Sequence, residues 1–480
     1  MNKFLWIGLQ FFGFSLVLTP IFRDIFRSFK VVDQPDLRGR KVHIYPIPRV
    51  GGIAIAIAYA LTFYFAWPSD GNVNRELSLV ANVLPAAALI FLTGLIDDFI
   101  GLKPWQKIIG QLIGAGLAWW AGVRIAGIAG HPLPDAWGLP LTIGWLLVCT
   151  NAFNLVDGLD GLAAGVGLFA TLTIFTAALI QGNEPLVFAT LPLAGCLLGF
   201  LCFNFSPATV FLGDCGSLLI GFLLGCFGVI WSHKSVTLLG LTAPLMALSL
   251  PLLDVLLCII RRWLRHQPIF TADRGHIHHR LLDRGMSPRQ VVLLLYGLCG
   301  VAAIFSLLQM LLHDAYIAGM VVFVFAVIAW MGIHYLRYAE FMLAGEMLRT
   351  GEFQRSVNAR MNLSSFEKEI LNAGTIDECW EAILKIRQTF GIAAIRLHAG
   401  GKSYEHWEPH VTAPDYWTMH IPLSDHEYVE IGREFGSPVL PMVVVPFVDL
   451  LAAALSDKLK DQASRAVSAG ESSVILQPGN

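Results

Sequence analysis

The sequence predicts an α-helical polytopic membrane protein with about 10–11 transmembrane helices, followed by a C-terminal α/β domain. Of its 480 residues, 55% are hydrophobic and only 14% are charged, which argues against a soluble multidomain enzyme. Residues 1–336 carry 20 Lys/Arg and 16 Asp/Glu, whereas residues 337–480 carry 13 and 19. The two parts therefore meet different solvents. The net charge of −2 excludes a generic polyanion binder, so no nucleic acid is expected as a partner.

Eleven stretches come close to the roughly 20 apolar residues that a membrane-spanning helix needs, with an uncertainty of about one span. They lie at about residues 4–22, 50–67, 79–96, 106–121, 139–156, 161–180, 185–205, 216–232, 236–260, 291–312 and 316–336. Glycine and proline inside them are tolerated in lipid-embedded helices. The first stretch lacks a cleavage site of small residues, so we expect a retained span.

The loops between these stretches differ in their content of basic residues. Segments 23–49, 97–107 and 261–290 together hold 16 Lys/Arg, whereas the opposite face holds four. The positive-inside rule places the richer set in the cytoplasm. With an odd number of spans, the N-terminus is then outside and the tail from residue 337 is cytosolic.

The tail has the pattern of a small α/β domain. We assign residues 337–361 to a helical connector, 362–462 to the domain and 463–480, rich in Ser, Ala and Gly, to a disordered tail. Helical patterns at about 364–388 are followed by strand-like runs that begin at residues 392, 416 and 427, and then by a last helix. This order resembles a GAF-like sensory module. A domain for stability or for oligomer contacts, as in a homodimer, is the alternative.

Five carboxylates lie at the predicted cytoplasmic ends of the spans: Asp97 and Asp98 after the third, Asp157 and Asp160 between the fifth and sixth, and Asp214 between the seventh and eighth. Charged groups at membrane depth usually mark a pathway or a site. Carboxylates brought together repel each other by ~1 kcal/mol per pair at 4 Å in water, and by more in a drier site. A cation is therefore expected among them.

Magnesium is the expected cation, with Mn²⁺ as an alternative. Mg²⁺ is bound by one or two carboxylates together with substrate phosphates. In FLGDCGS, Gly213 and Gly216 would let the backbone approach a ligand closely, and in DGLDG the two aspartates three residues apart can share one helical face. The alternatives are helix-end capping for the Asp97/Asp98 pair and a turn for DGLDG.

Three histidines, His276, His278 and His279, occur within four residues beside Asp273 and Arg274. Nitrogen ligands would favour zinc, but no cysteine is near, and the eight cysteines show no CxxC spacing. We therefore interpret HIHH as a phosphate- or sugar-binding loop. The five histidines of the tail show no ligand spacing, and no metal site is expected there.

Six ordered motifs of residues 1–336 together resemble one family, the polyprenyl-phosphate N-acetylhexosamine-1-phosphate transferases. The motifs are DQPDLRGRKVHIYPIPRVGG from Asp33, the Asp97–Asp98 pair with Lys107 and Gln111, NLVDGLDGLA from Asn154, NFSPATVFLGDCGS from Asn204, PLLDVLLCIIRR from Pro251 and DRGHIHHR from Asp273.

The resemblance implies roles for individual residues. Asp214 would be the principal magnesium ligand, and Asp97 and Asp98 would bind the metal or handle the lipid phosphate, one of them as its base. Asn154, Asp157 and Asp160 would hold the nucleotide and sugar-phosphate end, with both aspartates in the catalytic set. The histidines would lie over the pyrophosphate or sugar, His278 and His279 as catalytic residues and His276 as a binding residue. Lys107 and Asn204 would also bind substrate.

The implied reaction transfers HexNAc-1-phosphate, with GlcNAc favoured, from a UDP-sugar to polyprenyl phosphate, and we favour direct attack over a covalent intermediate. The expected place is the bilayer of the bacterial inner membrane, with the site and the tail in the cytoplasm. A phospho-MurNAc-pentapeptide translocase is the alternative. Those enzymes usually place a lysine three residues after the second aspartate, where this chain has Gly101. A membrane transporter is a distant alternative because its sites lie nearer the bilayer midplane, and an inactive scaffold governed by the tail is a third.

Overall fold

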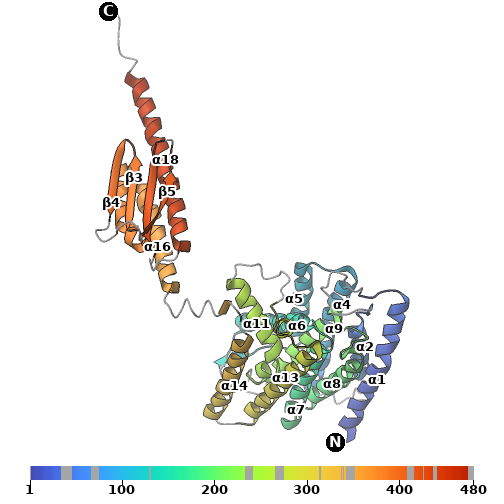
Figure 1. Cartoon of the computed structure of the whole chain (residues 1–480). Helices are drawn as coiled ribbons and strands as arrows, with labels where there is room; N and C mark the ends of the chain where they lie inside the picture. The colour runs from blue at the N-terminus through green and yellow to red at the C-terminus, as the bar shows by residue number, and fades with distance from the viewer. Residues whose placement is uncertain are drawn as a thin grey trace, which may run out of the picture. The chain divides into compact units, whose positions relative to one another are not determined.

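The structure of the chain is a computed structural model (Figure 1). It describes residues 2–33, 46–65, 75–128, 131–232, 242–264, 275–312, 315–336, 338, 340–341, 352–407, 416–424, 426–435 and 441–473. The chain divides into two compact units, Met1–Tyr338 and Ala339–Asn480. The first is helical and carries the apolar stretches, and the second holds the predicted α/β domain.

The first unit confirms a polytopic helical membrane protein. Eight segments of the described residues are long and apolar enough to cross a membrane: α1 (Asn2–Ser28), α3 (Arg75–Asn82) with α4 (Leu84–Ile100), α6 (Asp135–Val156), α7 (Leu162–Ile180), α8 (Glu184–Asn204), α9 (Asp214–Ser232), α13 (Pro288–Leu311) and α14 (Ala315–Leu336). The other three predicted stretches form shorter or broken helices: α2 (Gly51–Phe65), α5 (Pro104–Trp120) and the pair α10 (Thr242–Ala247) and α11 (Ser249–Leu264). The short helix α12 (Ile277–Asp283) and the hairpin of β1 (Gly127–Ile128) and β2 (His131–Pro132) connect longer helices.

Helix α9 forms the centre of this unit, since every residue from Cys215 to Trp231 is buried. It packs against α2, α4, α6 and α7. Small residues allow this close packing: a Cβ on Gly94 of α4 would lie 2.6 Å from the Asp214 carbonyl oxygen, and one on Gly221 would lie 2.6 Å from the Cys149 carbonyl oxygen of α6. The first turn of α9 therefore lies directly against α4, and its third turn lies directly against α6.

The segment before α2 pairs with the loop before α9. The Phe211 N–H donates to the Pro48 carbonyl at 2.9 Å, and the Gly51 and Gly52 N–H groups donate to the Phe211 and Leu212 carbonyls at 2.9 and 2.8 Å. These backbone hydrogen bonds hold Arg49 beside the start of α9, although more than 150 residues separate the two segments in sequence.

The second unit is an antiparallel four-stranded sheet in the order β4-β3-β6-β5. Its elements are α16 (Glu352–Asn372), α17 (Ile376–Ile386), the 3₁₀ turn η1 (Arg387–Phe390), β3 (Ala394–Ala399), β4 (Lys402–Trp407), β5 (Tyr416–Pro422), β6 (Tyr428–Glu434) and α18 (Pro441–Ser473). Buried side chains from α16, α17, α18 and one face of the sheet form its core, among them Phe366, Ile383, Leu397, Val429 and Phe447.

Two features of this unit differ from the sequence analysis. Strand β4 was not expected, because its sequence KSYEHW is polar and its side chains are exposed or half-buried at the edge of the sheet. Helix α18 continues to Ser473, into the stretch that was assigned to a disordered tail. The three expected strands are present as β3, β5 and β6. The GAF-like assignment stays a prediction.

Candidate active site

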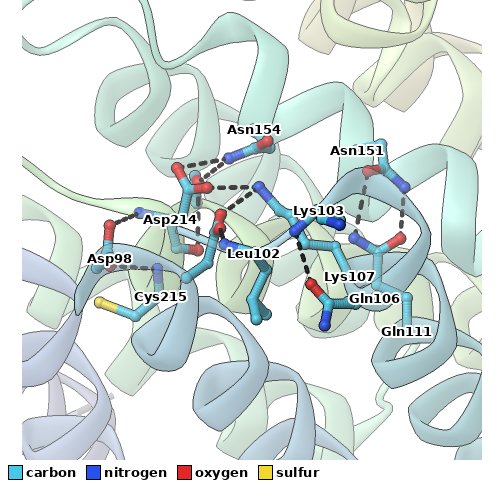
Figure 2. A network of polar contacts seen from close by, with 12 residues as sticks. Asp98, Leu102, Lys103, Gln106, Lys107, Gln111, Asn151, Asn154, Asp214 and Cys215 are labelled. Carbon is cyan, nitrogen blue, oxygen red and sulfur yellow. Dashed lines mark hydrogen bonds and ion pairs between the residues drawn. The ribbon is translucent and has the colours of Figure 1, made fainter. Parts of the chain in front are cut away.

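The centre of the candidate site is the ammonium group of Lys107, in the first turn of α5 (Figure 2). Its Nζ lies 2.5 Å from Asp97 Oδ2 and 2.5 Å from Asp214 Oδ2, so it joins the C-terminal end of α4 to the first residue of α9. A tight turn after α4 makes this possible: Gly101 has φ +75°, and the Leu102 N–H donates to Asp97 Oδ1 at 2.6 Å. The positive charge between these two carboxylates in the structure is thus the ammonium group of Lys107.

Asp214 is held from a second direction by α6. The Asn154 side-chain amide donates to Asp214 Oδ1 and to Ser217 Oγ, both at 3.0 Å. Asn154 lies in the last turn of α6, at the same end of the bundle as Asp97. The Asp214 carboxylate therefore has one oxygen on Lys107 and one on Asn154, as Figure 2 shows.

Asp98 has a different environment from Asp97. Its two oxygens accept the backbone N–H groups of Asp214 and Cys215 at 2.8 and 2.9 Å. Asp98 thus satisfies two of the N–H groups that a helix N-terminus leaves free, and its charge suits the positive end of the helix dipole. The capping alternative therefore applies to this aspartate, although the helix that it caps is α9 and not its own.

The DGLDG segment is a turn and not a helix, so Asp157 and Asp160 do not share a helical face. It connects α6 to α7, and Gly161 adopts φ +79° before α7 begins. Burial, together with the charges of Asp214 and Asp98, raises the pKa of Asp157 to about 8, and Asp160 adds to this while Arg49 lowers it. Asp157 therefore lies within the field of the carboxylates around Lys107.

Asp160 and Asn204 form hydrogen bonds with the backbone of the loop before α9. One Asp160 oxygen accepts the Ala208 N–H at 2.9 Å. The buried Asn204 amide accepts the Gly161 N–H at 3.1 Å and donates to the Val210 carbonyl at 2.9 Å. The structure thus places Asn204 in protein contacts on both ends of its amide, away from the group of side chains that meets at Lys107.

The glycines of FLGDCGS approach the protein rather than leaving a space for a ligand. Gly213 has φ +78°, and a Cβ there would lie 2.8 Å from Asp98 Oδ2. A Cβ on Gly216 would lie 2.5 Å from a Leu212 methyl carbon and 2.9 Å from the Cα of Gly52. These two glycines therefore allow α2, α4 and α9 to meet closely.

The histidines lie at the start of α12. His276 precedes the helix, and its ring stacks on that of His278 with the centroids 5.8 Å apart, while the His278 and His279 centroids are 4.3 Å apart. His278 is buried against the DGLDG turn: a Cβ on Gly158 would lie 2.5 Å from its Nε2. Burial, with a smaller contribution from His279, lowers the pKa of His278 to about 3, so this imidazole is neutral near pH 7. Asp273 and Arg274 lie outside the described residues.

Two further contributions had no role in the sequence analysis. Arg49 pairs with Asp33 at 3.1 Å, and its charge lowers the pKa of Asp157. It lies inside the first quoted motif, of which residues 34–45 are outside the described residues. Gln111 and Asn151 exchange two amide hydrogen bonds of 3.2 and 2.6 Å, which join α5 to α6 (Figure 2). Gln111 was part of a quoted motif, which was the available signal, whereas its partner had none.

The carboxylates of Asp97 and Asp214 could hold a hard divalent ion only together with phosphate oxygens of a substrate. Among the described residues, no group of three His, Cys, Asp or Glu side chains is close enough to hold a metal ion. Asp97 and Asp214, however, converge on a single cationic centre. Two carboxylates with substrate phosphates make a typical Mg²⁺ site in proteins, so these residues fit the expected ion.

Comparisons with known proteins agree with this architecture. The profile of glycosyl transferase family 4 matches residues 80–232, which run from the third span to the end of α9. The probable undecaprenyl-phosphate N-acetylglucosaminyl 1-phosphate transferase of Bacillus subtilis (strain 168) is 36% identical over 323 residues, 66% of this chain and 87% of the relative. The decaprenyl-phosphate N-acetylglucosaminephosphotransferase of Mycobacterium tuberculosis is 35% identical over 294 residues, 55% of this chain and 73% of the relative.

A third relative represents another branch. The phospho-N-acetylmuramoyl-pentapeptide-transferase of Limosilactobacillus fermentum is 34% identical over 253 residues, 50% of this chain and 78% of the relative. All three alignments cover more than two thirds of the relative. Residues 80–232, which the family profile matches, contain Asp97, Asp98, Lys107, Asn154 and Asp214. The chain therefore belongs to the polyprenyl-phosphate N-acetylhexosamine-1-phosphate transferase family, within glycosyl transferase family 4.

Proposed function

We propose that the chain transfers GlcNAc-1-phosphate from UDP-GlcNAc to polyprenyl phosphate, releasing UMP and forming polyprenyl-diphosphate-GlcNAc. This would be the first lipid-linked step of cell-envelope polysaccharide synthesis. The observation that carries the proposal is the position of Lys107, 2.5 Å from both Asp97 and Asp214 at the ends of apolar helices. A charged centre at a helix-end boundary suits a reaction between a lipid-bound phosphate and a water-soluble nucleotide sugar.

Mg²⁺, or Mn²⁺ in its place, would be held by Asp214 and Asp97, with Asn154 keeping the Asp214 carboxylate in place. When bound, the ion would neutralise phosphate charge that develops during the transfer. Lys107 would be displaced from one or both carboxylates and would then face the substrate phosphates. Support comes from the two carboxylates that already converge on a single positive charge.

The transfer needs little proton chemistry from the protein. An oxygen of the lipid phosphate forms a bond to the β-phosphorus of UDP-GlcNAc. The bond from that phosphorus to the oxygen that bridges it to the α-phosphorus breaks, so that UMP leaves with the electron pair. A phosphate monoester has a second pKa near 6, so most of the attacking group is already deprotonated near pH 7. Both Asp98 oxygens accept backbone N–H groups of α9, whereas Asp97 accepts one backbone N–H on Oδ1 and faces Lys107 with Oδ2. Of the pair, Asp97 would therefore be the one with an oxygen open to a remaining proton once Lys107 is displaced.

The backbone at Gly101 supports a GlcNAc donor over UDP-MurNAc-pentapeptide. The resemblance places a lysine at this position in the translocases. Here the residue has φ +75°, a conformation that glycine adopts freely and that lysine adopts only with strain. The turn that carries Lys107 over Asp97 is therefore built for glycine.

Orientation is part of the proposal. The end of α4 that carries Asp97 and Asp98 adjoins segment 97–107, one of the three segments that together hold 16 Lys and Arg residues. The contacts of Asp214 with Lys107 and Asn154 bring the start of α9 and the end of α6 to the same place. The positive-inside rule then puts the site and the second unit on the cytoplasmic side of the inner membrane. Cysteine labels placed in the 275–290 segment and in the second unit are expected to resist membrane-impermeant reagents in intact cells. Labelling of either from outside would refute this orientation.

The reaction is tested with purified protein, undecaprenyl phosphate and a panel of labelled UDP-GlcNAc, UDP-GalNAc and UDP-MurNAc-pentapeptide. We expect lipid-linked GlcNAc and UMP in equal amounts, with dependence on Mg²⁺ shown by chelation and re-addition. D214N, which removes one charge at nearly constant shape, should lower the rate by orders of magnitude without loss of folded protein. UMP release without a lipid product, or uptake of intact UDP-sugar into vesicles, would contradict the proposal.

A further inference from the structure

Asp254 is a buried carboxylate that does not belong to the group around Lys107. It lies in α11, within the PLLDVLLCIIRR segment, and only 2% of it is exposed. A buried carboxylate loses its hydration, so it persists only where hydrogen bonds replace the water. The partners of Asp254 therefore indicate what this carboxylate does.

Both oxygens of Asp254 are used by the start of α12. Oδ2 lies 2.9 Å from His276 Nδ1, and Oδ1 accepts the Ile277 N–H at 2.8 Å. A carboxylate only accepts hydrogen bonds, so Nδ1 of His276 carries the hydrogen that faces it. This contact fixes the orientation of the His276 ring and, in the neutral imidazole, leaves Nε2 as the acceptor.

His276 contacts His278, and His278 contacts the DGLDG turn. The His276 and His278 rings are nearly parallel, with an interplanar angle of 6° and centroids 5.8 Å apart. His278 in turn meets Gly158, where an added Cβ would lie 2.5 Å from Nε2. A continuous series of contacts thus runs from Asp254 through two histidines to the turn that contains Asp157.

The residue before His276 is held as well. The Gly275 carbonyl accepts the Tyr338 hydroxyl at 3.2 Å, and the guanidinium carbons of Arg261 and Arg280 lie 4.9 and 5.1 Å from the centre of the Tyr338 ring. Tyr338 is itself buried. The histidine segment is therefore fixed at two consecutive residues, at Gly275 by Tyr338 and at His276 by Asp254.

We propose that Asp254 is a positioning residue for the transfer reaction: it sets the His276 ring and thereby places His278 against the DGLDG turn. This inference rests on the proposed function, in which that turn handles the nucleotide-sugar end of the donor. Asp254 touches neither substrate; its effect passes through the histidines. Its loss should therefore affect the donor and leave the lipid phosphate almost unaffected.

The test uses the full-length protein and D254N. An asparagine keeps the shape but turns one acceptor into a donor, so it cannot accept from both Ile277 and His276. Loss of groups that orient a functional histidine typically costs 10- to 100-fold, as measured at metal sites. We expect a fall of about that size in kcat/KM for UDP-GlcNAc, with the KM for polyprenyl phosphate unchanged. S306A is the control, because it removes a buried hydrogen bond from Ser306 to the Ala243 carbonyl in the same unit.

A double-mutant cycle with H276Q tests the route of the effect. If Asp254 acts through His276, kcat/KM for UDP-GlcNAc in the D254N/H276Q protein is no lower than in the less active of the two single variants. Should D254N not accumulate as folded protein, G158A provides a second test, since the added Cβ would press on His278 alone, without strain from a positive φ. G158A should show the same donor-selective loss.

The outcomes separate this inference from the proposed function. The inference would be overturned if D254N impaired the use of polyprenyl phosphate as much as the use of UDP-GlcNAc. It would also be overturned if the losses in kcat/KM of the two single variants multiplied in the double variant, or if D254N or G158A had wild-type kinetics. A wild-type protein that forms no lipid-linked product would instead refute the proposed function, and this is measured first in the same assay.

Discussion

Replacing Lys107 with methionine removes the positive charge between two carboxylates while keeping much of the side-chain volume. Asp97 Oδ2 and Asp214 Oδ2 each lie 2.5 Å from the same nitrogen, so they are at most about 5 Å apart. At an effective dielectric constant of 20, two unit negative charges at this distance repel each other by about 3 kcal/mol. The K107M protein is therefore expected to be less stable than the wild type by an amount of this order when no divalent cation is present.

Divalent cations should reverse this loss. Once the lysine no longer competes for the carboxylates, Mg²⁺ should bind more tightly to the folded variant than to the wild type, and ligand binding raises stability by mass action. Thermal unfolding in detergent, with EDTA and then with increasing Mg²⁺, is the measurement. The matched control is K103M, which removes the same charge from the exposed lysine before α5.

We expect a lower Tm for K107M than for K103M in EDTA, and a larger rise with Mg²⁺. Transfer activity should stay low in K107M even at saturating Mg²⁺, because the lysine would no longer face the phosphates. Equal unfolding temperatures of the two variants in EDTA, or a Mg²⁺ response no larger in K107M than in the wild type, would show that the two carboxylates do not form one cation site.

Three further predictions follow from the same geometry. His278 has a folded-state pKa of about 3, below its unfolded value, so protonation favours the unfolded chain as the pH falls below about 6.5; H278Q should flatten the loss of Tm between pH 6.5 and 5. D98N should lower stability by about 2 kcal/mol, since an amide replaces the acceptor of two backbone N–H groups of α9, and unfolding in EDTA measures this. A chain ending at Phe341 should keep transferase activity, whereas one ending at Leu336 lacks Tyr338 and should be much less active in the lipid-product assay. Inactivity of both, in folded protein, would place the second unit within the catalytic machinery.

Much of the architecture could be predicted from the sequence because hydropathy acts locally. Each of the eleven apolar stretches corresponds to a helix or to a pair of helices. Only eight segments of the described residues qualify as membrane spans, fewer than the eleven stretches, because α2 and α5 are short and the helix is broken between α10 and α11. Strand β4 was missed since an edge strand with polar side chains lacks the alternation that indicates a half-buried strand.

The site was predicted as a set of residues but not as an arrangement. Neighbouring residues of a helix point about 100° apart, so Asp97 and Asp98 had to face different partners, and only the packing of α4 on α9 decides which faces which. Asp254 was present in a quoted motif without a role. Its partners lie 22 and 23 residues away across a segment with no periodic pattern to connect them.

The two aspartates of the pair illustrate how one helix end can serve structure and chemistry together. Asp98 neutralises the start of α9 and so fixes the position of the first residue of that helix, which is Asp214. Asp97, one residue earlier, faces the charge that Asp214 faces. A shift of α4 relative to α9 would therefore break the cap and separate the two carboxylates at the same time. The cap thus makes the spacing of Asp97 and Asp214 a property of the packed bundle, which a flexible loop carrying the same residues could not maintain.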